Sequence, residues 1–496
     1  MLWLTARAVV RPLSSPRLLN CLSMPHCHTP RNFGSETEVV IALGSNLGNR
    51  VQNLTEALRL LEGARVKVLG HSCLYESAPV HLEDQPFFLN AAVLAKTSLS
   101  PTVLLDLVKS IELDLGRDLS NNAMRWGPRP VDLDIIFYGS KRVHTERLAI
   151  PHERWHIRDF VKAPLANLAG LQCCEGTDVQ SMLAEASRLW QEEGGEALIG
   201  SRQLRRVMPF GNELLEFGKC TKVMGILNVT PDSFSDGGLF NTVDLALAQA
   251  RCMVEEGADM IDIGGQSTRP RADRVPAEQE VERVVPIIKA LREEPKLQNI
   301  LISIDTFYGE VAKEGVRAGA HIVNDVSAGK LDRTMFRQVA ELNVPYVMMH
   351  MRGNPQTMQQ EENTTYRDIC KEVGEELQCS VEAAMSTGVL GWNVILDPGI
   401  GFSKTHAGNV QLIRGLKRIW HEGLSGTCQQ MPRLLGVSRK GFIGTITEKK
   451  DARQRDVASA AAAVACVAGG ADIIRAHNAG FTRDAAIMAD AIYRKK

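Results

Sequence analysis

The chain has 496 residues, of which 44% are hydrophobic and 23% charged, and its formal net charge is −1. This length predicts two or three domains. The charge balance, with no run of like charge, argues against non-specific binding to nucleic acid or to a membrane surface. No apolar segment reaches the roughly 18–20 residues that a membrane helix needs. The eleven cysteines lack metal-binding spacing and indicate reduced thiols in an intracellular protein.

The first 35 residues contain several arginines and no acidic residue, the first being Glu36. Arginine-rich, acid-free leaders with hydroxyl residues are typical of organelle transit peptides, and a disordered tail is the alternative. We therefore predict a transit peptide over residues 1–35 and a location in the mitochondrial matrix. If translation starts at Met24, most of this leader is lost and the protein is cytosolic.

Residues 36–195 have the pattern of a compact α+β domain. Apolar or alternating runs predict strands at 39–43, 66–75, 88–95 and 131–138. Helices are predicted up to residue 61, over 101–115, where Pro101 occupies the first turn, and over 161–188. The weakly patterned residues 196–218 are predicted as a linker to a second domain over 219–496.

Two aspartates lie two residues apart in the predicted strand 131–138. Side chains two apart share a face of a strand, so Asp132 and Asp134 point the same way. Adjacent carboxylates repel unless a cation joins them, and a divalent ion carrying nucleotide phosphates is suited to this. Three arginines are available for the phosphates: Arg117, Arg125 and Arg129. Two solvated aspartates on a sheet edge are the alternative, and the absence of GxxxxGK[ST] excludes a P-loop kinase.

Residues 219–496 repeat a strand–helix rhythm. The rhythm begins with a near-continuous apolar run, as in strands covered on both faces, and then enters the loop TPDSFSDGG. About eight units in roughly 275 residues match a closed (β/α)8 TIM barrel. An open doubly wound sheet is the alternative, but its GxGxxG fingerprint is absent. The predicted strands are 223–229, 260–264, 300–305, 321–326, 346–350, 394–397, 434–437 and 473–476, with helices at 243–256, 277–293, 309–318, 366–387 and 455–469.

Hydrogen-bonding or charged residues stand at the end of every predicted barrel strand, where barrel active sites form. A single such residue is commonly a turn former or a helix cap, but here every strand end carries one. One set, here called the heterocycle group, is suited to a flat heterocycle with amide and amine edges; its members are Asp305, Asn324, Asp397 and Lys440. A second set, here called the anion group, is suited to bind an anion; its members are Asn228, Thr268, Arg269, Arg475 and His477. One Mg²⁺ held by Asn228 and by ligand phosphates fits the anion group.

The motifs NVTPDSFSDGG, GGQSTRP, IVNDVS, MHMRGNPQTM, LDPGIGF, SRK and RAH follow in this order between Thr221 and Lys496. Together they resemble dihydropteroate synthase over essentially that whole segment. The resemblance implies that the heterocycle group binds a pterin, that the anion group holds its diphosphate, and that the barrel forms a homo-oligomer. It further implies that Met349 and Phe402 line the pterin slot, that Phe234, Pro270 and Ser438 border a p-aminobenzoate site, and that the catalytic residues are Asp305, Lys440 and Arg269. Gln266 stands where many bacterial relatives have Glu, and we expect no loss of activity from this difference.

The segment from Val39 to roughly Glu192 carries ALGSNLGNR, DQPFFLNAAV, IELDLGR, RWGPRPVDLDII and IPHERWHIRDF. It resembles 6-hydroxymethyl-7,8-dihydropterin pyrophosphokinase, an enzyme with a ferredoxin-like fold. The resemblance implies that Asp132 and Asp134 bind two Mg²⁺ with ATP, and that Arg117 and Arg129 act catalytically on the transferring diphosphate. The implied ATP contacts are Glu112, Arg117, Trp126, Arg129, His152 and Arg158. The implied pterin contacts are Ser77, Val80, Phe88, Asn90 and Phe160.

The two resemblances combine into one hypothesis, a bifunctional enzyme of folate biosynthesis. Its substrates would be ATP, a hydroxymethyl-dihydropterin and p-aminobenzoate, with no nucleic-acid or membrane partner. A pterin-binding methyltransferase barrel and a catalytically inactive pterin-binding protein are the alternatives. The diphosphate-type STR loop and the attached first domain would be idle in a methyltransferase. The intact acidic and basic residues of both predicted sites argue against an inactive protein.

Overall fold

The computed structural model describes residues 36–80, 82–118, 120, 124, 126–171, 176–200, 204–211, 213–229, 239–267, 269 and 274–494, with only the backbone at 239–242. The predicted transit peptide therefore lies outside the described residues. Within these ranges, each helix is too short or too polar to traverse a lipid bilayer.

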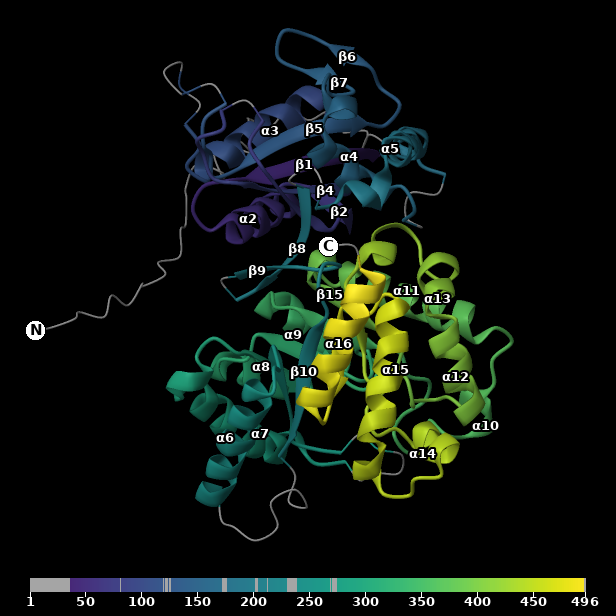
Figure 1. Ribbon diagram of the computed structural model, residues 1–496. Coiled ribbons are helices and arrows are strands. Elements are labelled where there is room, and N and C mark those ends of the chain that lie inside the picture. The colour runs from purple at the N-terminus through teal and green to yellow at the C-terminus, as the bar shows by residue number, and fades with distance from the viewer. Residues whose placement is uncertain are drawn as a thin grey trace, which may run out of the picture. The chain divides into compact units, whose positions relative to one another are not determined.

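An antiparallel sheet forms the first domain (Figure 1). Its strands follow the order β5–β1–β4–β3–β8–β9, and β2 pairs with β4. The bounds are β1 Thr37–Ser45, β2 Val66–His71, β3 Leu74–Ser77, β4 Phe88–Thr97, β5 Asp132–Tyr138, β8 Leu204–Phe210 and β9 Glu213–Glu216. A separate two-stranded ribbon consists of β6 Val143–His144 and β7 Ala149–Ile150.

Both faces of this sheet are covered by helices, as strand β1 illustrates. Val39 and Ile41 pack with the buried residues of two helices, whereas Val40 packs with those of two others. Because residues two apart share a face of a strand, the two pairs of helices cover opposite faces. The first pair is α2 Arg50–Gly63 and α3 Pro101–Asp114, and the second is α4 Asp159–Leu168 and α5 Gln180–Glu192. This α+β arrangement is the predicted ferredoxin-like domain.

Two predicted elements are each divided in the structure, and their predicted continuity was wrong. The strand predicted over 66–75 breaks into β2 and β3 because the Ser72 hydroxyl, rather than a backbone carbonyl, accepts the Ala92 N–H at 2.9 Å. The helix predicted over 161–188 breaks into α4 and α5. Gly176 lies between them with a φ of +72°, a left-handed conformation that an α-helix does not contain.

The segment 196–218, predicted as the linker, contains the hairpin of β8 and β9. Strand β8 pairs with β3, and Val207 lies opposite Leu74. Met208 and Phe210 pack in one cluster with residues of the second domain such as Ile322. The hairpin is therefore a strand pair of the first sheet that also contributes to the second domain's core. Two adjacent arginines and Pro209 interrupt the alternation of β8, which is why its sequence does not predict a strand.

Eight parallel strands form the second domain, in the order β15–β14–β13–β12–β11–β10–β17–β16 (Figure 1). A backbone bridge between Leu396 and Arg433 joins the two ends of this order, so the sheet closes into the predicted (β/α)8 barrel. The strand bounds are β10 Lys222–Asn228, β11 Met260–Gly264, β12 Leu301–Asp305, β13 Ile322–Asp325, β14 Tyr346–Met349, β15 Val394–Asp397, β16 Leu434–Leu435 and β17 Ile473–Ala476.

Helices lie between the barrel strands and bury their apolar faces against them. Val284 and Ile288 on one helix, for example, share a core cluster with Ile261, Ile263 and Ile302 on the strands. The helices are α6 Leu239–Glu255, α7 Ala277–Glu293, α8 Gly309–Ala318, α9 Met335–Leu342, α10 Glu361–Thr364, α11 Ile369–Ser386, α12 His406–Arg414, α13 Leu416–Glu422, α14 Gly441–Thr447, α15 Asp456–Ala468 and α16 Ala479–Tyr493.

The register of the barrel brings several strand ends to one level. Asn228 lies opposite Gly264, Gly264 opposite Asp305, and Asp305 opposite Asn324. Met349 and Asp397 are likewise opposite each other. Because these residues end their strands, or in the case of Asn324 stand one position before the end, the polar positions predicted from the sequence lie along the same rim of the barrel.

Two candidate active sites

A cavity of about 960 Å³ lies in the first domain. Both aspartates, Asp132 and Asp134, line it. So do all the ATP- and pterin-binding residues predicted for this domain except Glu112: Ser77, Val80, Phe88, Asn90, Arg117, Trp126, Arg129, His152, Arg158 and Phe160. Arg125 lies outside the described residues. The structure thus gathers in one cavity side chains that the sequence spreads over more than 80 positions.

Glu112 is fully buried and does not line the cavity. Its Oε1 accepts hydrogen bonds from Leu133 N and Lys109 Nζ, both at 2.8 Å, and forms an ion pair with Arg117 Nη1 at 2.9 Å. Burial raises the pKa of Glu112, although Lys109 and Arg117 act in the opposite direction. Glu112 therefore acts on the cavity by holding these two cations. Lys109 was not predicted as a site residue, although its spacing of three from Glu112 on a helix could have indicated it.

The two aspartates of β5 have different surroundings. Asp132 is paired with Arg117 and, at 2.9 Å, with Arg129 Nη2, whereas Asp134 Oδ2 lies 4.0 Å from the ring nitrogen Nε2 of His152. Burial raises the pKa of both, but at Asp132 the two arginines outweigh burial and its pKa is lowered. Burial and the neighbouring charge of Asp132 together raise the pKa of Asp134.

This carboxylate pair fits a divalent cation. Its mutual repulsion, visible at Asp134, is what a cation between the two groups would relieve. Among the described residues, no group of three or more His, Cys, Asp or Glu side chains is arranged to hold a metal. The remaining ligands of such an ion would therefore be phosphate oxygens and water, which Mg²⁺ accepts readily.

Aromatic rings and an amide occupy another part of this cavity. The guanidinium carbon of Arg129 lies 5.1 Å from the centre of the Phe88 ring, and that of Arg158 lies 5.7 Å from the Phe160 ring. Asn90 Nδ2 donates to Tyr75 O at 3.1 Å and to Ser77 Oγ at 3.0 Å, which fixes the amide. Two rings and an oriented amide suit a flat heterocycle with polar edges.

The interior of the barrel holds a network of buried charges. Arg475 donates from Nε to Asp262 Oδ2 and from Nη2 to Asp305 Oδ2, both at 2.6 Å. Asn324 Nδ2 donates to the same oxygen of Asp262 at 3.0 Å. The other carboxylate oxygens, Oδ1 of Asp262 and Oδ1 of Asp305, are buried and have no hydrogen-bond partner within the described part of the chain. They are acceptors for a ligand that presents N–H groups.

Asp262 was not predicted as a site residue. A lone acid in the middle of the apolar strand Met260–Gly264 is the sequence signal that could have found it. Arg475 was predicted with the anion group, and the structure gives it the two carboxylate partners described above.

Burial favours the uncharged forms of the three titratable residues of the heterocycle group. Burial raises the pKa of Asp305 to about 7, against the charge of Arg475, and that of Asp397 to about 6. Burial, and then Arg475, lowers the pKa of Lys440 to about 8. Lys440 Nζ lies 4.3 Å from the centre of the Phe402 ring, and Phe402 shares a buried cluster with Met349. The predicted ring-binding and edge-binding residues therefore converge.

The anion group lies beside them in part. The backbone N–H of His477 donates to Ser438 Oγ at 3.1 Å, and its Nδ1 lies 3.1 Å from the same oxygen. Burial lowers the pKa of His477 to about 3, with Arg475 and Arg269 among the cations that add to this. Asn228 is half-buried at the end of β10. Thr268, Phe234 and Pro270 lie outside the described residues.

Each of the two sites lies in a segment of the chain that matches a known protein family. Residues 224–477 match the family model of pterin binding enzymes, and residues 40–170 match that of 7,8-dihydro-6-hydroxymethylpterin-pyrophosphokinase. The mitochondrial folate synthesis bifunctional protein of Pisum sativum is 47% identical over 490 residues, which cover 96% of this chain and 95% of that protein. The chain belongs to the bifunctional folate synthesis proteins.

A second member of this family gives the same result. The mitochondrial folate synthesis bifunctional protein of Arabidopsis thaliana is 49% identical over 469 residues, covering 93% of this chain and 84% of that protein. A solved HPPK-DHPS structure matches 93% of this chain and 100% of its own, with a TM-score of 0.71 and 22% identity, and bears on the two-domain fold alone.

Membership in the bifunctional folate synthesis family decides between the hypotheses from the sequence. The protein is an enzyme with a pyrophosphokinase activity, for which ATP is a substrate, and a dihydropteroate synthase activity. The methyltransferase alternative does not account for the attached pyrophosphokinase domain, which the family model covers over residues 40–170.

Proposed function

We propose that the two sites act on one pterin in succession. In the first-domain cavity, ATP transfers its diphosphate to 6-hydroxymethyl-7,8-dihydropterin and AMP leaves. In the mouth of the barrel, p-aminobenzoate displaces that diphosphate and 7,8-dihydropteroate forms. The observation that carries this proposal is that each domain gathers ring-binding and phosphate-type residues at one place, the cavity in one and the strand ends in the other.

In the first step, Asp132 and Asp134 would hold two Mg²⁺ together with the nucleotide. Bound Mg²⁺ supplies neutralisation of the phosphate charge during transfer. Arg117 and Arg129 orient the transferring diphosphate. The remaining nucleotide contacts are Glu112, acting through Arg117, and Trp126, His152 and Arg158. Phe88 and Phe160 enclose the pterin ring, and its edge contacts Asn90, Ser77 and Val80. The lining of the single cavity by nearly all of these residues supports the assignment.

In the second step, Asp305, Asn324, Asp397 and Lys440 would bind the polar edge of the pterin, while Met349 and Phe402 contact its ring. The unpartnered carboxylate oxygen of Asp305 supports this, because a pterin presents N–H donors. Arg269, Thr268, Asn228, His477 and Arg475 would hold the leaving diphosphate, with one Mg²⁺ at Asn228. Phe234, Pro270 and Ser438 would border the p-aminobenzoate.

The main contribution of the barrel to the second reaction is electrostatic. A methylene carbon beside an electron-rich pterin tolerates positive charge, so the bond to the diphosphate can break before the arylamine attacks. Arg269 and its neighbours then stabilise the charge of the leaving group. Asp305 and Lys440 hold the ring so that the nucleophile approaches the correct carbon.

We also propose a location and an assembly. The arginine-containing leader and the mitochondrial relatives support the mitochondrial matrix, with the cytosol for a product begun at Met24. A homo-oligomer through the barrel is supported by exposed apolar side chains on α15 and α16: Val457, Phe481, Met488 and Ile492. The proposed domains are 36–195 and 219–496, and the segment 196–218 between them carries the β8–β9 hairpin, which pairs with the first sheet.

A coupled assay of the purified full chain tests this function. With ATP, Mg²⁺, hydroxymethyl-dihydropterin and p-aminobenzoate, we expect AMP and dihydropteroate in equal amounts. Without ATP, supplied pterin diphosphate should still give dihydropteroate. AMP without dihydropteroate in the complete mixture, together with no dihydropteroate from supplied pterin diphosphate, would contradict the role proposed for the barrel. Dihydropteroate only from supplied pterin diphosphate would contradict that of the cavity.

A further inference from the structure

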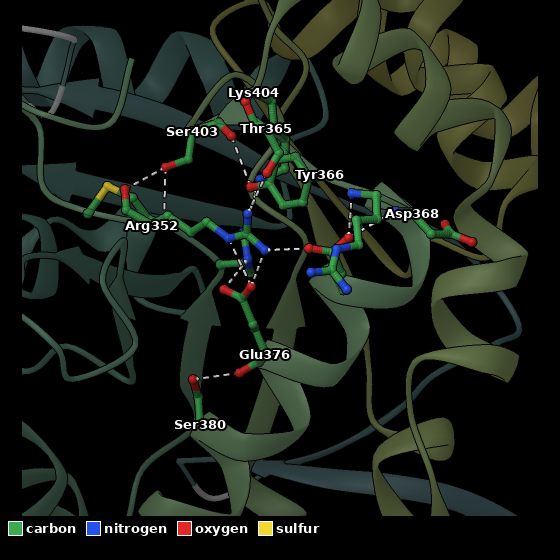
Figure 2. Close-up of polar contacts among 12 residues, drawn as sticks. Arg352, Thr365, Tyr366, Asp368, Glu376, Ser380, Ser403 and Lys404 are labelled. Carbon is green, nitrogen blue, oxygen red and sulfur yellow. Dashed lines mark hydrogen bonds and ion pairs between the residues drawn. The ribbon is translucent and has the colours of Figure 1, made fainter. Parts of the chain in front are cut away.

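Arg352, in the loop that follows β14, contacts two other segments of the barrel (Figure 2). Its Nε donates to Glu376 Oε1 and its Nη2 to Glu372 Oε2, each at 2.9 Å, and both acceptors belong to α11. Its Nη1 donates to Thr365 O at 2.9 Å. The guanidinium carbon also lies 3.9 Å from the centre of the Tyr366 ring. Arg352 therefore fixes its loop against α11 and the segment before it.

The backbone of Arg352 is tied to a second loop, the one that follows β15. Its N–H donates to Ser403 Oγ at 2.9 Å, and the Ser403 hydroxyl donates to Arg352 O at 2.7 Å (Figure 2). Tyr366 Oη donates to Ser403 O at 2.9 Å. Ser403 is fully buried and has a φ of +53°, a left-handed conformation that residues with a Cβ seldom adopt. Such a conformation persists where the surrounding contacts hold it, often at a functional site.

A buried lysine connects the same two loops again. Lys404 Nζ donates to Phe402 O at 2.9 Å and lies 3.0 Å from His350 Nδ1. The carboxylate of Glu376 can only accept, so His350 Nε2, which lies 3.1 Å from Glu376 Oε2, carries the ring proton and Nδ1 accepts from Lys404 Nζ. Lys404 is only 2% exposed, and burial lowers its pKa to about 7, so its amino group depends on these partners rather than on water. Glu376 therefore contacts Arg352 directly and is connected to Lys404 through His350.

Both loops border the proposed pterin slot. Met349 ends β14, immediately before the first loop, and Phe402 immediately precedes Ser403 in the second. Phe402 in turn lies beneath the ammonium group of Lys440. Met349 is held by the pairing of β14 with β15, whereas the position of Phe402 relative to it depends on what joins the two loops.

We propose that Arg352, Ser403 and Lys404 are positioning residues of the second reaction, which lock the two loops together and so hold Met349 and Phe402 for a flat pterin ring. The inference rests on the pterin slot proposed above. A network that served the stability of the barrel alone would affect both substrates of the second reaction alike, whereas a positioning network affects the pterin.

The test uses the full chain with Ser403→Ala and Ser403→Gly. Both remove the reciprocal hydrogen bonds with Arg352, and the glycine also removes the Cβ from the left-handed conformation. Because two buried hydrogen bonds are lost, we expect the KM for pterin diphosphate to rise roughly fivefold or more in both variants. The KM for p-aminobenzoate and the release of AMP should stay at wild-type values. Ser386→Ala, an exposed serine at the end of α11, is the matched control and should change neither KM.

Lys404→Met supplies an independent measurement, with the exposed Lys417→Met as its control. It should reproduce the rise in KM for pterin diphosphate. If Ser403→Ala, Ser403→Gly and Lys404→Met lower only the melting temperature, or raise both KM values equally, the inference is wrong.

Phe402→Ala separates this failure from a failure of the slot. If Phe402→Ala raises the KM for pterin diphosphate while the Ser403 and Lys404 variants do not, the slot stands and the positioning role is refuted. If Phe402→Ala leaves that KM unchanged, the proposed slot is wrong and the inference falls with it.

Discussion

The two sites hold their carboxylates in opposite ways. In the first domain, the side chains of Asp132 and Asp134 are 21% and 34% exposed and sit in an open cavity. In the barrel, those of Asp262 and Asp305 are 0% and 10% exposed, and Arg475 bridges them. The first arrangement suits a site whose charge balance is completed by substrate phosphates and ions. The second suits a site that must be balanced before any substrate arrives, because an unpaired charge is costly in a dry interior.

Energetics explain why this difference matters. Ion pairs with access to water contribute about 0–1 kcal/mol, since water screens both partners. Breaking a buried pair by removing one partner costs about 3–5 kcal/mol, since the other charge is left without compensation. Variants of the first site should therefore affect chemistry more than stability, and variants of the barrel network should affect both.

The largest expected effect is that of Asp134→Ala on the first reaction. Removing this carboxylate should slow AMP release on the order of 10³-fold, because charge neutralisation provides most of the catalysis of phosphoryl transfer. Turnover of supplied pterin diphosphate should change by less than about twofold, since Asp134 lines the first-domain cavity and is not one of the barrel's site residues. Asp114→Ala, an exposed acid at the end of α3, is the control. Loss of both reactions would show that the two sites are not independent.

Arg475→Met is expected to have the largest effect on stability. It leaves Asp262 and Asp305 without their common partner, so the free energy of unfolding should fall by about 3–5 kcal/mol and the second reaction should stop. Arg129→Met leaves Asp132 paired with Arg117, so no carboxylate loses its last cation and the free energy of unfolding should fall by less than in Arg475→Met. Urea unfolding followed by tryptophan fluorescence measures both. Equal losses would mean that burial does not distinguish the two networks.

The pH dependence should also differ between the sites. Asp305 and Asp397, with pKa values of about 7 and about 6, accept hydrogen bonds from the pterin at both oxygens only when ionised, so the second reaction should weaken as the pH falls below 7. Lys440, with a pKa of about 8, loses its charge as the pH rises further, so the reaction should weaken above 8. In the first site the pKa of Asp132 is lowered and that of Asp134 is raised, so AMP release should weaken with falling pH through protonation of Asp134, while Asp132 stays ionised.

Profiles of kcat/KM for pterin diphosphate and of AMP release, measured on the same preparation, check this prediction. Activity that remains in Lys440→Arg should lack the alkaline decline, because arginine keeps its proton throughout this range. A second reaction with a flat profile between pH 6 and 9 would contradict the assigned roles.

Local patterns were sufficient to predict much of the fold. The strand 260–264 and the helices 277–293 and 309–318 have the predicted bounds, because each shows a continuous apolar run or a clear helical period. The rim was predictable for a related reason, since a polar residue that ends a strand must lie at the carboxyl end of a barrel. The prediction of one continuous strand over 66–75 was wrong because a single hydroxyl, that of Ser72, replaces a backbone acceptor there.

Pairings across the barrel could not be predicted in this way. Arg475 and Asp262 are 213 positions apart, and only the closing of β17 beside β10, which neighbours β11, brings them together. Strand β8 was missed because its stability comes from pairing with β3 and from packing against barrel residues rather than from its own alternation. Long-range contacts of this kind leave no periodic trace in the sequence.

The smallest expected effect concerns Gln266, which donates to the buried carboxyl group of Glu280. Burial raises the pKa of Glu280 to about 8, so this group is neutral at pH 7. In Gln266→Glu the two neighbouring acids can share that proton. Asp132 and Asp134 in the first domain need not share one, because arginines lower the pKa of Asp132 while that of Asp134 is raised. We expect the second reaction to change by less than about twofold at pH 7, with Gln298→Glu, an exposed position, as the control. As the pH rises through about 8, the folded pair must release a proton that the unfolded chain has already lost, so the melting temperature should fall increasingly below that of the wild type. A large loss of activity at pH 7 would mean instead that Glu280 is ionised there, and that buried acids in this barrel are held apart as they are in the first domain.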